Sequence, residues 1–299
     1  MKTNLNHSGS FRHIRSMRAL ATLAMSAAAM FGAASATAAP ILSDALASFA
    51  VLGASGVTNV PVSIIGGNLG SAPNASVGGG YIFTSGSRQG NTLLAQQAQL
   101  DLDAAIVTLS SFGPGITILD GNLDAYQFMH GGSIAPGIYT VSGAEVNLSG
   151  DLVLDGGNDR SAMWIFQLPS TLITSTTSNV LVQNVGDGAN VGVYWNVHSA
   201  ATLNGPTFEG NVLANNLISS DGNLTISCGR LLSANSQVTL IQDRISITGC
   251  ANGGFAQGAP IGSGGIGGSD GQVVPEPATL ALFGFGLAAV AVSRRRRPR

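Results

Sequence analysis

Three consecutive blocks of 19 residues, 190–208, 209–227 and 228–246, repeat a loose pattern in which short apolar runs alternate with Asn, Ser, Thr and Gly. Stacking the blocks aligns two sets of residues: Val193 with Val212 and Leu231, and Thr202 with Ser220 and Thr239. A repeat near 20 residues is typical of a solenoid, whose coils bury a continuous core only when they stack on one another. The repeat therefore predicts an all-β solenoid, with a β-sandwich or a barrel as the alternative.

One segment, residues 91–112, differs from the strand-like runs around it because its apolar residues recur at helical spacing. Gly113-Pro114-Gly115 follows directly and ends the pattern. The segment is predicted to be one amphipathic helix that lies on an apolar wall. The predicted apolar stripe consists of Leu94, Ala98, Leu102, Ala105, Ile106 and Leu109.

Residues 1–38 have the features of a secretory signal peptide. A positively charged start, with Lys2 and three arginines, precedes an Ala-rich apolar run that begins at Ala19. Ala36-Thr37-Ala38 then supplies a cleavage site of the small-x-small type. We expect the mature chain to begin at Ala39 or Pro40, followed by one domain over residues 39–252.

The C-terminal part combines a Gly-rich linker, residues 253–273, with a second targeting segment, residues 274–299. That segment places a Pro-Glu-Pro motif before the apolar run 278–293 and an arginine cluster, an order that predicts a membrane anchor with cytoplasmic arginines. The key residues are Pro275, Glu276, Pro277, Arg294, Arg295, Arg296 and Arg297. The segment closely resembles the PEP-CTERM sorting signal of Gram-negative bacteria. The resemblance implies transient anchoring in the inner membrane, an exosortase-type sorting enzyme as partner, and a final place at the cell surface or outside the cell.

Charge is unevenly distributed along the chain. Nine of the 13 basic residues lie in the two targeting segments, so residues 40–273 keep only four arginines against 14 acidic residues, a net charge near −10. Nucleic acids and anionic membrane surfaces are recognised by basic patches. This composition therefore argues against both as partners of the exported domain, and membrane contact is expected only through the C-terminal helix before processing.

The chain has two cysteines, Cys228 and Cys250, both in the part predicted to be exported. Export favours a disulfide between them, which would stabilise the domain by roughly 3 kcal/mol in the chain-entropy model. A zinc site would need further ligands, and the mature region offers only His130 and His198 in addition. We therefore predict no metal and no cofactor.

Several segments resemble the DUF3494 ice-binding family in both content and order. They are SFAVLGASGVTNVPVSIIGGNLGSAPN (48–74), APGIYTVSGAEVNLSGDLVLDG (135–156), WIFQLPSTLIT (164–174), GVYWNVHSAATLNGPTFEGNVLANNLIS (192–219) and GRLLSANSQVTLIQDRIS (229–246). The resemblance implies a right-handed parallel β-helix, triangular in section, with one long α-helix packed alongside. It also implies that the N- and C-terminal segments lie side by side and that one flat β-face binds ice.

Short polar residues that recur with the repeat are the candidates for such a face. Threonine methyl and hydroxyl groups on a rigid β-grid can order water, whereas charged groups would disrupt that order. The candidate residues are Thr171, Thr174, Thr202, Asn204, Ser220 and Thr239.

Two other functional classes remain as alternatives. A polysaccharide-cleaving enzyme on this fold would need a basic residue beside acidic ones, but the predicted mature domain has no lysine, and Asp155, Asp159 and Arg160 occur in a turn-like run. We therefore predict that the protein is not an enzyme. A cell-surface or biofilm-matrix scaffold or adhesion protein, bound to exopolysaccharide rather than to ice, is the second alternative. Trp164 and Trp195 could stack on sugars, but their strand-like surroundings favour core packing.

Overall fold

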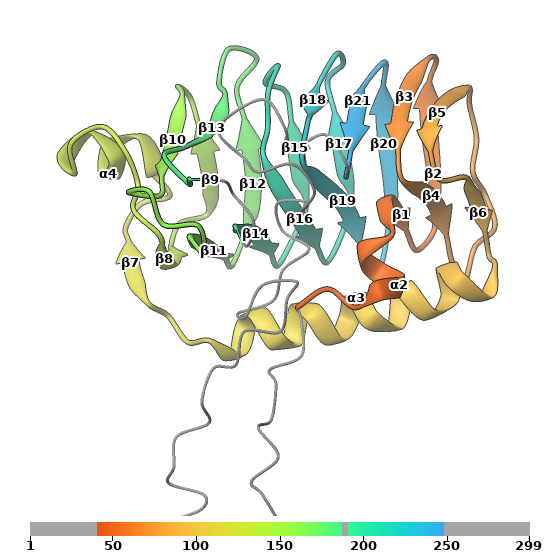
Figure 1. Cartoon of the computed structure of the whole chain (residues 1–299), viewed down its shortest axis with the longest axis horizontal. Coiled ribbons are helices and arrows are strands. Elements are labelled where there is room, and N and C mark those ends of the chain that lie inside the picture. The colour runs from red at the N-terminus through yellow and green to blue at the C-terminus, as the bar shows by residue number, and fades with distance from the viewer. Residues whose placement is uncertain (1–40, 187–190, 248–299) are drawn as a thin grey trace, which may run out of the picture. The chain divides into compact units, whose positions relative to one another are not determined.

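A computed structural model describes residues 41–186 and 191–247, all of which belong to one compact unit, Thr37–Val274. In this unit the chain coils repeatedly through three faces and forms a parallel β-helix (Figure 1). The predicted signal peptide, linker and sorting segment, together with Cys250, lie outside the described residues.

The largest sheet, sheet A, has nine strands. Its order differs from the order along the chain, because the three N-terminal strands follow the C-terminal one. The strands in spatial order are β6 (Arg88–Gly90), β4 (Asn68–Ser71), β1 (Phe49–Gly53), β19 (Gly229–Ser233), β16 (Gly210–Ala214), β14 (Gly192–Val197), β11 (Met163–Leu168), β8 (Gly137–Val141) and β7 (Ile116–Ile118).

The second face is sheet B, a single sheet of six strands. In order they are β2 (Gly56–Val60), β20 (Gln237–Ile241), β17 (Ile218–Ser220), β15 (Ala201–Leu203), β12 (Thr171–Thr174) and β9 (Glu145–Leu148). The third face is divided into two sheets. Sheet C holds β18 (Thr225–Ile226), β21 (Arg244–Ser246), β3 (Ser63–Gly66) and β5 (Tyr81–Ser85), and sheet D holds β10 (Leu152–Asp155) and β13 (Val180–Gln183).

The N-terminal coil stacks on the C-terminal coil. β1 pairs with β19, β2 with β20 and β3 with β21, all in parallel. This arrangement confirms the expectation that the two ends of the domain lie side by side. The β-helix prediction is therefore confirmed, and the sandwich and barrel alternatives are excluded.

The core inside the coils is a column of apolar side chains with a ladder of stacked aromatic rings. Phe166 lies 5.5 Å from Tyr139 and 4.2 Å from Trp195, measured between ring centroids, and Trp195 lies 5.2 Å from Phe208. The indole N–H groups of Trp164 and Trp195 donate to the main-chain oxygens of Ile134 and Glu209, at 3.0 and 3.1 Å. Both tryptophans are fully buried, which confirms that they belong to the core.

Helix α3 (Leu93–Ser111) runs along the outer side of sheet A, as Figure 1 shows. Thr92 begins the helix by accepting a hydrogen bond from the Ala95 N–H, and Gly113, with φ of 78°, follows its C-terminal residue Phe112. The buried stripe is Ala95, Ala98, Leu102, Ala105 and Leu109. The predicted helix is confirmed, but Leu94 is 37 % exposed and was wrongly placed on the stripe, where Ala95 takes its place.

A buried arginine attaches the N-terminal segment to sheet A. The guanidinium of Arg230 donates to the Ala47 oxygen from Nε and Nη2, at 3.1 and 2.6 Å, and to Asn211 Oδ1 from Nη1 at 2.9 Å. Ala47 ends the short helix α2 (Asp44–Ala47), so this contact fixes the start of the domain. Burial lowers the pKa of Arg230 to about 10, which leaves it charged at neutral pH. In the next coil segment Cys228 is disulfide-bonded.

Helix α3 supplies a direct test of how the fold is stabilised. Leu102 is fully buried between the helix and sheet A, whereas Leu100, on the same helix, is 65 % exposed. Replacing Leu102 with Ala should lower the free energy of unfolding by about 2–5 kcal/mol, because it leaves a cavity. Leu100→Ala should change it by less than about 0.5 kcal/mol. Urea unfolding of both variants measures the difference, and equal effects would contradict this packing.

Candidate functional site

Sheet A offers no free outer face to a ligand. Every residue of β1, β16 and β19 is buried, because the inner side chains face the core and the outer ones lie under α2 and α3. The contact side of this face is an apolar cluster that includes Leu52, Leu213 and Leu232 together with the alanine-rich stripe of α3. A large flat ligand would therefore have to bind one of the other two faces.

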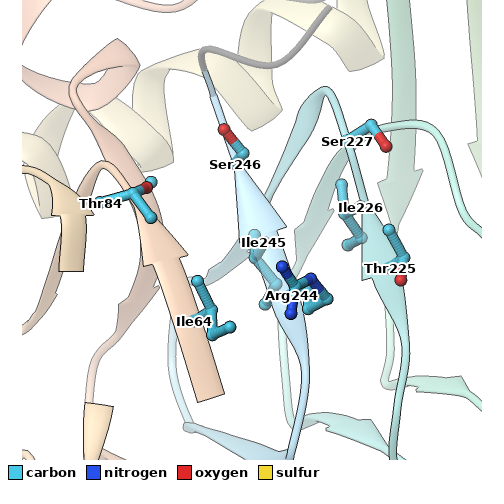
Figure 2. A pocket seen from close by; sticks show the side chains of 9 residues that line it. Ile64, Thr84, Thr225, Ile226, Ser227, Arg244, Ile245 and Ser246 are labelled. Carbon is cyan, nitrogen blue, oxygen red and sulfur yellow. The ribbon is translucent and has the colours of Figure 1, made fainter. Parts of the chain in front are cut away.

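The third face is interrupted and charged. Sheets C and D are joined only through isolated bridges of Thr207 to Asn179 and Thr225. The register places the exposed Arg244 between Thr225 and Ile64 on this face. Figure 2 shows the hollow around Arg244, which is lined by hydroxyl and isoleucine side chains. This face is therefore neither flat nor uncharged.

Sheet B, in contrast, is continuous, and its side chains alternate cleanly between the core and the outside. One inward row runs in register across the six strands and is fully buried: Val146, Leu172, Ala201, Ile218, Val238 and Val57. One outward row lies beside it and is called the central row: Asn147, Ile173, Thr202, Ser219, Thr239 and Thr58. The parallel ladder spaces successive members by about 4.8 Å.

The central row carries hydroxyl and methyl groups and no charged side chain. Thr58 Oγ1 donates to Thr239 Oγ1 at 3.1 Å, and Ser219 Oγ donates to Thr202 Oγ1 at 3.4 Å. These bonds hold neighbouring hydroxyls in fixed positions while leaving acceptor capacity directed outward. The carboxylate closest in register is that of Glu145, opposite Thr171 on the edge strand β9. The row is thus an ordered, neutral strip of alternating polar and apolar groups.

The predicted candidates fall into two groups. Thr202 and Thr239 lie in the central row, and Thr171 lies on the same face, half-buried on β12. Asn204 is half-buried just after β15. Thr174 and Ser220 were wrong, because they are only 2 % and 5 % exposed and point inward.

The two inward residues have structural partners instead. Thr174 Oγ1 accepts hydrogen bonds from the N–H groups of Asn204 and Gly205, at 2.8 and 3.1 Å, and Ser220 donates to the Asp243 carboxylate. Ser220 was selected because a repeat of 19 residues was applied uniformly. The step from Thr202 to its true neighbour Ser219 is 17 residues, and a slip of one residue turns a side chain to the opposite face.

Four members of the central row were missed. Ser219 could have been found from the alternation with the buried Ile218, and Ile173 and Asn147 from the same alternation in their own strands. Thr58 had no local signal, because it joins the row only through the pairing of β2 with β20, 181 residues away in the sequence.

A buried carboxylate supports the edge of sheet B where it turns into sheet C. Asp243 is fully buried and accepts hydrogen bonds from Ser220 and from the N–H groups of Ile241 and Leu224, at 3.0 and 3.1 Å. Its own N–H donates to Ser63 Oγ at 2.9 Å. The network links three successive coils. Burial raises the pKa of Asp243 above its ordinary value, although these hydrogen bonds oppose the shift.

No arrangement suited to catalysis or metal binding was found in the described residues. His198 Nε2 lies 3.4 Å from Ser110 Oγ, but that hydroxyl donates to the Ile106 oxygen at 2.8 Å and not to the imidazole. His130 is stacked on Tyr126, with its Nδ1 2.7 Å from the Tyr126 oxygen. Within residues 41–186 and 191–247, no group of three His, Cys, Asp or Glu side chains is placed to hold a metal ion.

Comparison with known families agrees with this geometry. The family model described as ice-binding-like matches residues 51–246, the span from β1 to β21. The chain belongs to the ice-binding-like family. A second model, the PEP-CTERM protein-sorting motif, matches residues 273–297, so the chain carries a sorting motif that is found on exported proteins.

Two curated ice-binding proteins illustrate how far this ice-binding-like chain resembles its relatives. The protein from Nostoc sp. (strain HG1) is 34 % identical over 260 residues, covering 83 % of this chain and 84 % of the relative. The protein from Colwellia sp. is 26 % identical over 212 residues, covering 66 % of this chain and 80 % of the relative.

Two solved structures match the fold of the ice-binding-like domain. One is an ice-binding protein from an Antarctic biological consortium, with a TM-score of 0.61 and 31 % identity over 70 % of this chain and 91 % of that structure. Another, from the Antarctic ascomycete Antarctomyces psychrotrophicus, has a TM-score of 0.58 and 31 % identity over 68 % and 96 % of the two chains. In the described part of our chain, no helix is long and apolar enough to cross a membrane.

A second buried acid of the ice-binding-like domain, Glu209, lies just before β16 and is 8 % exposed. Burial raises the pKa of Glu209 to about 8, and a hydrogen bond from the Cys228 N–H lowers it only in part. The folded state therefore binds the proton more tightly than the unfolded chain, in which the reference value is 4.5. Stability is then greatest at low pH and declines as the pH rises toward 8.

Glu209→Gln tests this dependence. Between about pH 5 and pH 9 the free energy of unfolding of the wild type should fall by several kcal/mol, at most about 5, because the ionised carboxylate loses hydration. The Gln variant should lose most of this dependence, with Asp243 responsible for a remainder of the same sign. Urea unfolding at the two pH values measures both slopes. Equal slopes in wild type and variant would contradict the assignment.

Proposed function

We propose that this chain is an exported ice-binding protein that adsorbs to ice through the outer face of sheet B. The observation that carries the proposal is the central row, a neutral line of Thr, Ser, Ile and Asn in register across six strands. The curated relatives are ice-binding proteins, which supports the same assignment.

The geometry of sheet B is suited to ordering water. The strands fix one spacing, near 4.8 Å, and alternate residues along each strand fix a second, near 6.5–7 Å. Side chains on such a grid hold hydroxyls and methyls in a regular two-dimensional array. Water bound to the hydroxyls and caged around the methyls can then join the crystal, so that the contact is largely water-mediated.

Rigidity strengthens the contact because little conformational freedom has to be lost on binding. The inward neighbours of the central row are all fully buried, and the network of Asp243, Ser220 and Ser63 fastens one edge of the sheet. A charged side chain in the row would hold water in its own radial shell. The only carboxylate beside the grid, Glu145, lies on the edge strand β9, away from the hydroxyl pairs.

The remaining parts of the proposal concern processing. Residues 1–38 would be removed as a signal peptide, and residues 274–299 would be recognised by an exosortase-type enzyme after the apolar run 278–293 had anchored the chain in the inner membrane. The domain at 39–252 would then act at the cell surface or outside a Gram-negative cell, without catalysis. Its candidate contacts are Thr58, Thr171, Thr202, Ser219 and Thr239, with Asn204 at the margin.

Tyrosine substitutions on sheet B test the face directly. Thr202→Tyr and Thr239→Tyr would each lift a flat ligand off the central row, so about tenfold more protein should be needed to stop ice recrystallisation. Thr225→Tyr is the matched control, because Thr225 is an outward, half-buried threonine on sheet C. It should retain wild-type activity. Equal losses in all three variants, or none in any, would refute the assignment of sheet B.

A further inference from the structure

The two ends of the solenoid differ in their exposed side chains. At one end α4 (Leu123–Met129) and β7 leave several apolar groups in solvent, as seen at the left of Figure 1. Phe128 is 85 % exposed, Met129 72 % and Leu119 68 %. Water-exposed side chains of this size in one place are characteristic of a contact surface. We call this the α4 end.

The opposite end, formed by β5 and β6 at the right of Figure 1, presents aromatic rings and a cation. Tyr81 and Phe83 are half-buried against the core, with ring centroids 6.2 Å apart. The guanidinium of Arg88 lies 5.3 Å above the Tyr81 ring. We call this the β6 end, and its shape is that of an apolar surface with one positive charge.

The charges of the two ends are complementary. Residues 116–155, which build the α4 end and the coil behind it, contain five acidic residues and no lysine or arginine. Residues 45–100, which build the β6 end, contain Arg88 as their only charged residue. An acidic surface with exposed apolar groups therefore stands at one end, and an aromatic surface with a cation stands at the other.

Main-chain groups at both ends are already bonded to side chains. At the α4 end Asp124 accepts from the N–H of Ser149 at 2.8 Å, and Gln127 accepts from the Val153 N–H at 2.6 Å. At the β6 end Arg88 donates to the oxygens of Val77 and Gly79, both at 3.1 Å. These bonds oppose continuation of the β-ladder from one molecule to the next. Contact between ends would accordingly be made by side chains.

We propose that this domain associates head to tail with a second copy of itself, the α4 end of one molecule against the β6 end of the next. Phe128 and Met129 then cover the Tyr81 and Phe83 rings, and the acidic residues approach Arg88. A contact between two different surfaces does not close on itself, so it produces open chains of molecules. The end of one solenoid is small compared with a standard interface, which makes the association weak and dependent on concentration. The proposal is independent of ice binding.

Sedimentation of the Thr37–Val274 unit tests the association. At low salt the mean mass should increase with protein concentration beyond that of a dimer, since the chain stays open. Raising the ionic strength from about 0.05 to about 0.5 M should weaken the association about tenfold, because the attraction of exposed charges is screened. A monomer at every concentration and salt level would overturn the proposal, and so would a dimer that does not grow.

Two variants, each altered at one end, give a sharper test. Phe128→Asp blocks the α4 end and Arg88→Glu blocks the β6 end, so each alone should sediment as a monomer. When mixed, they should form a 1:1 dimer, because the intact α4 end of the Arg88→Glu molecule meets the intact β6 end of the Phe128→Asp molecule. Circular dichroism confirms that each variant is folded.

Leu100→Asp is the control, because Leu100 is 65 % exposed on α3 between the two ends. It should associate like the wild type. Failure of the folded single-end variants to form the mixed dimer would contradict head-to-tail contact, and so would loss of association in Leu100→Asp.

Discussion

Each coil of this domain can bury its apolar side chains only against the coils on either side of it, so the parallel ladder between coils is the constraint on which everything else depends. The ladder includes the pairing of the N-terminal coil with the C-terminal one through β1 and β19, β2 and β20, and β3 and β21. It aligns Val57 with Val238 in the core and, as a direct consequence, Thr58 with Thr239 outside. The flat, regular face of sheet B therefore results from core packing.

Charge is placed in the molecule so that it does not interrupt that face. Arg230 is buried under sheet A, where it holds Ala47 and Asn211, and Arg88 bonds main-chain oxygens at the β6 end. Arg244 lies on sheet C. Asp243 is buried behind the edge of sheet B, where it joins three coils. With these groups elsewhere, the central row keeps only neutral side chains, which is the condition for a surface that orders water.

The sequence predicted more of the fold than of the site, for physical reasons that particular residues show. Helical spacing identified α3, yet Leu94 was placed on its buried stripe where Ala95 belongs, because periodicity locates a face only to within one residue. In a strand the same error inverts the face, as for Ser220 and Ser219. Thr58 depends on a pairing across 181 residues that no local pattern encodes, and only the family resemblance indicated that the two ends meet.

The most direct measurement of the central claim is partition of the purified Thr37–Val274 unit between a slowly growing ice crystal and the remaining liquid. The account predicts that the protein is enriched in the ice, because the central row adsorbs to the advancing surface, and that Thr202→Tyr reduces this enrichment. Exclusion of the folded wild-type protein from the ice, as for an ordinary soluble protein, would contradict the account.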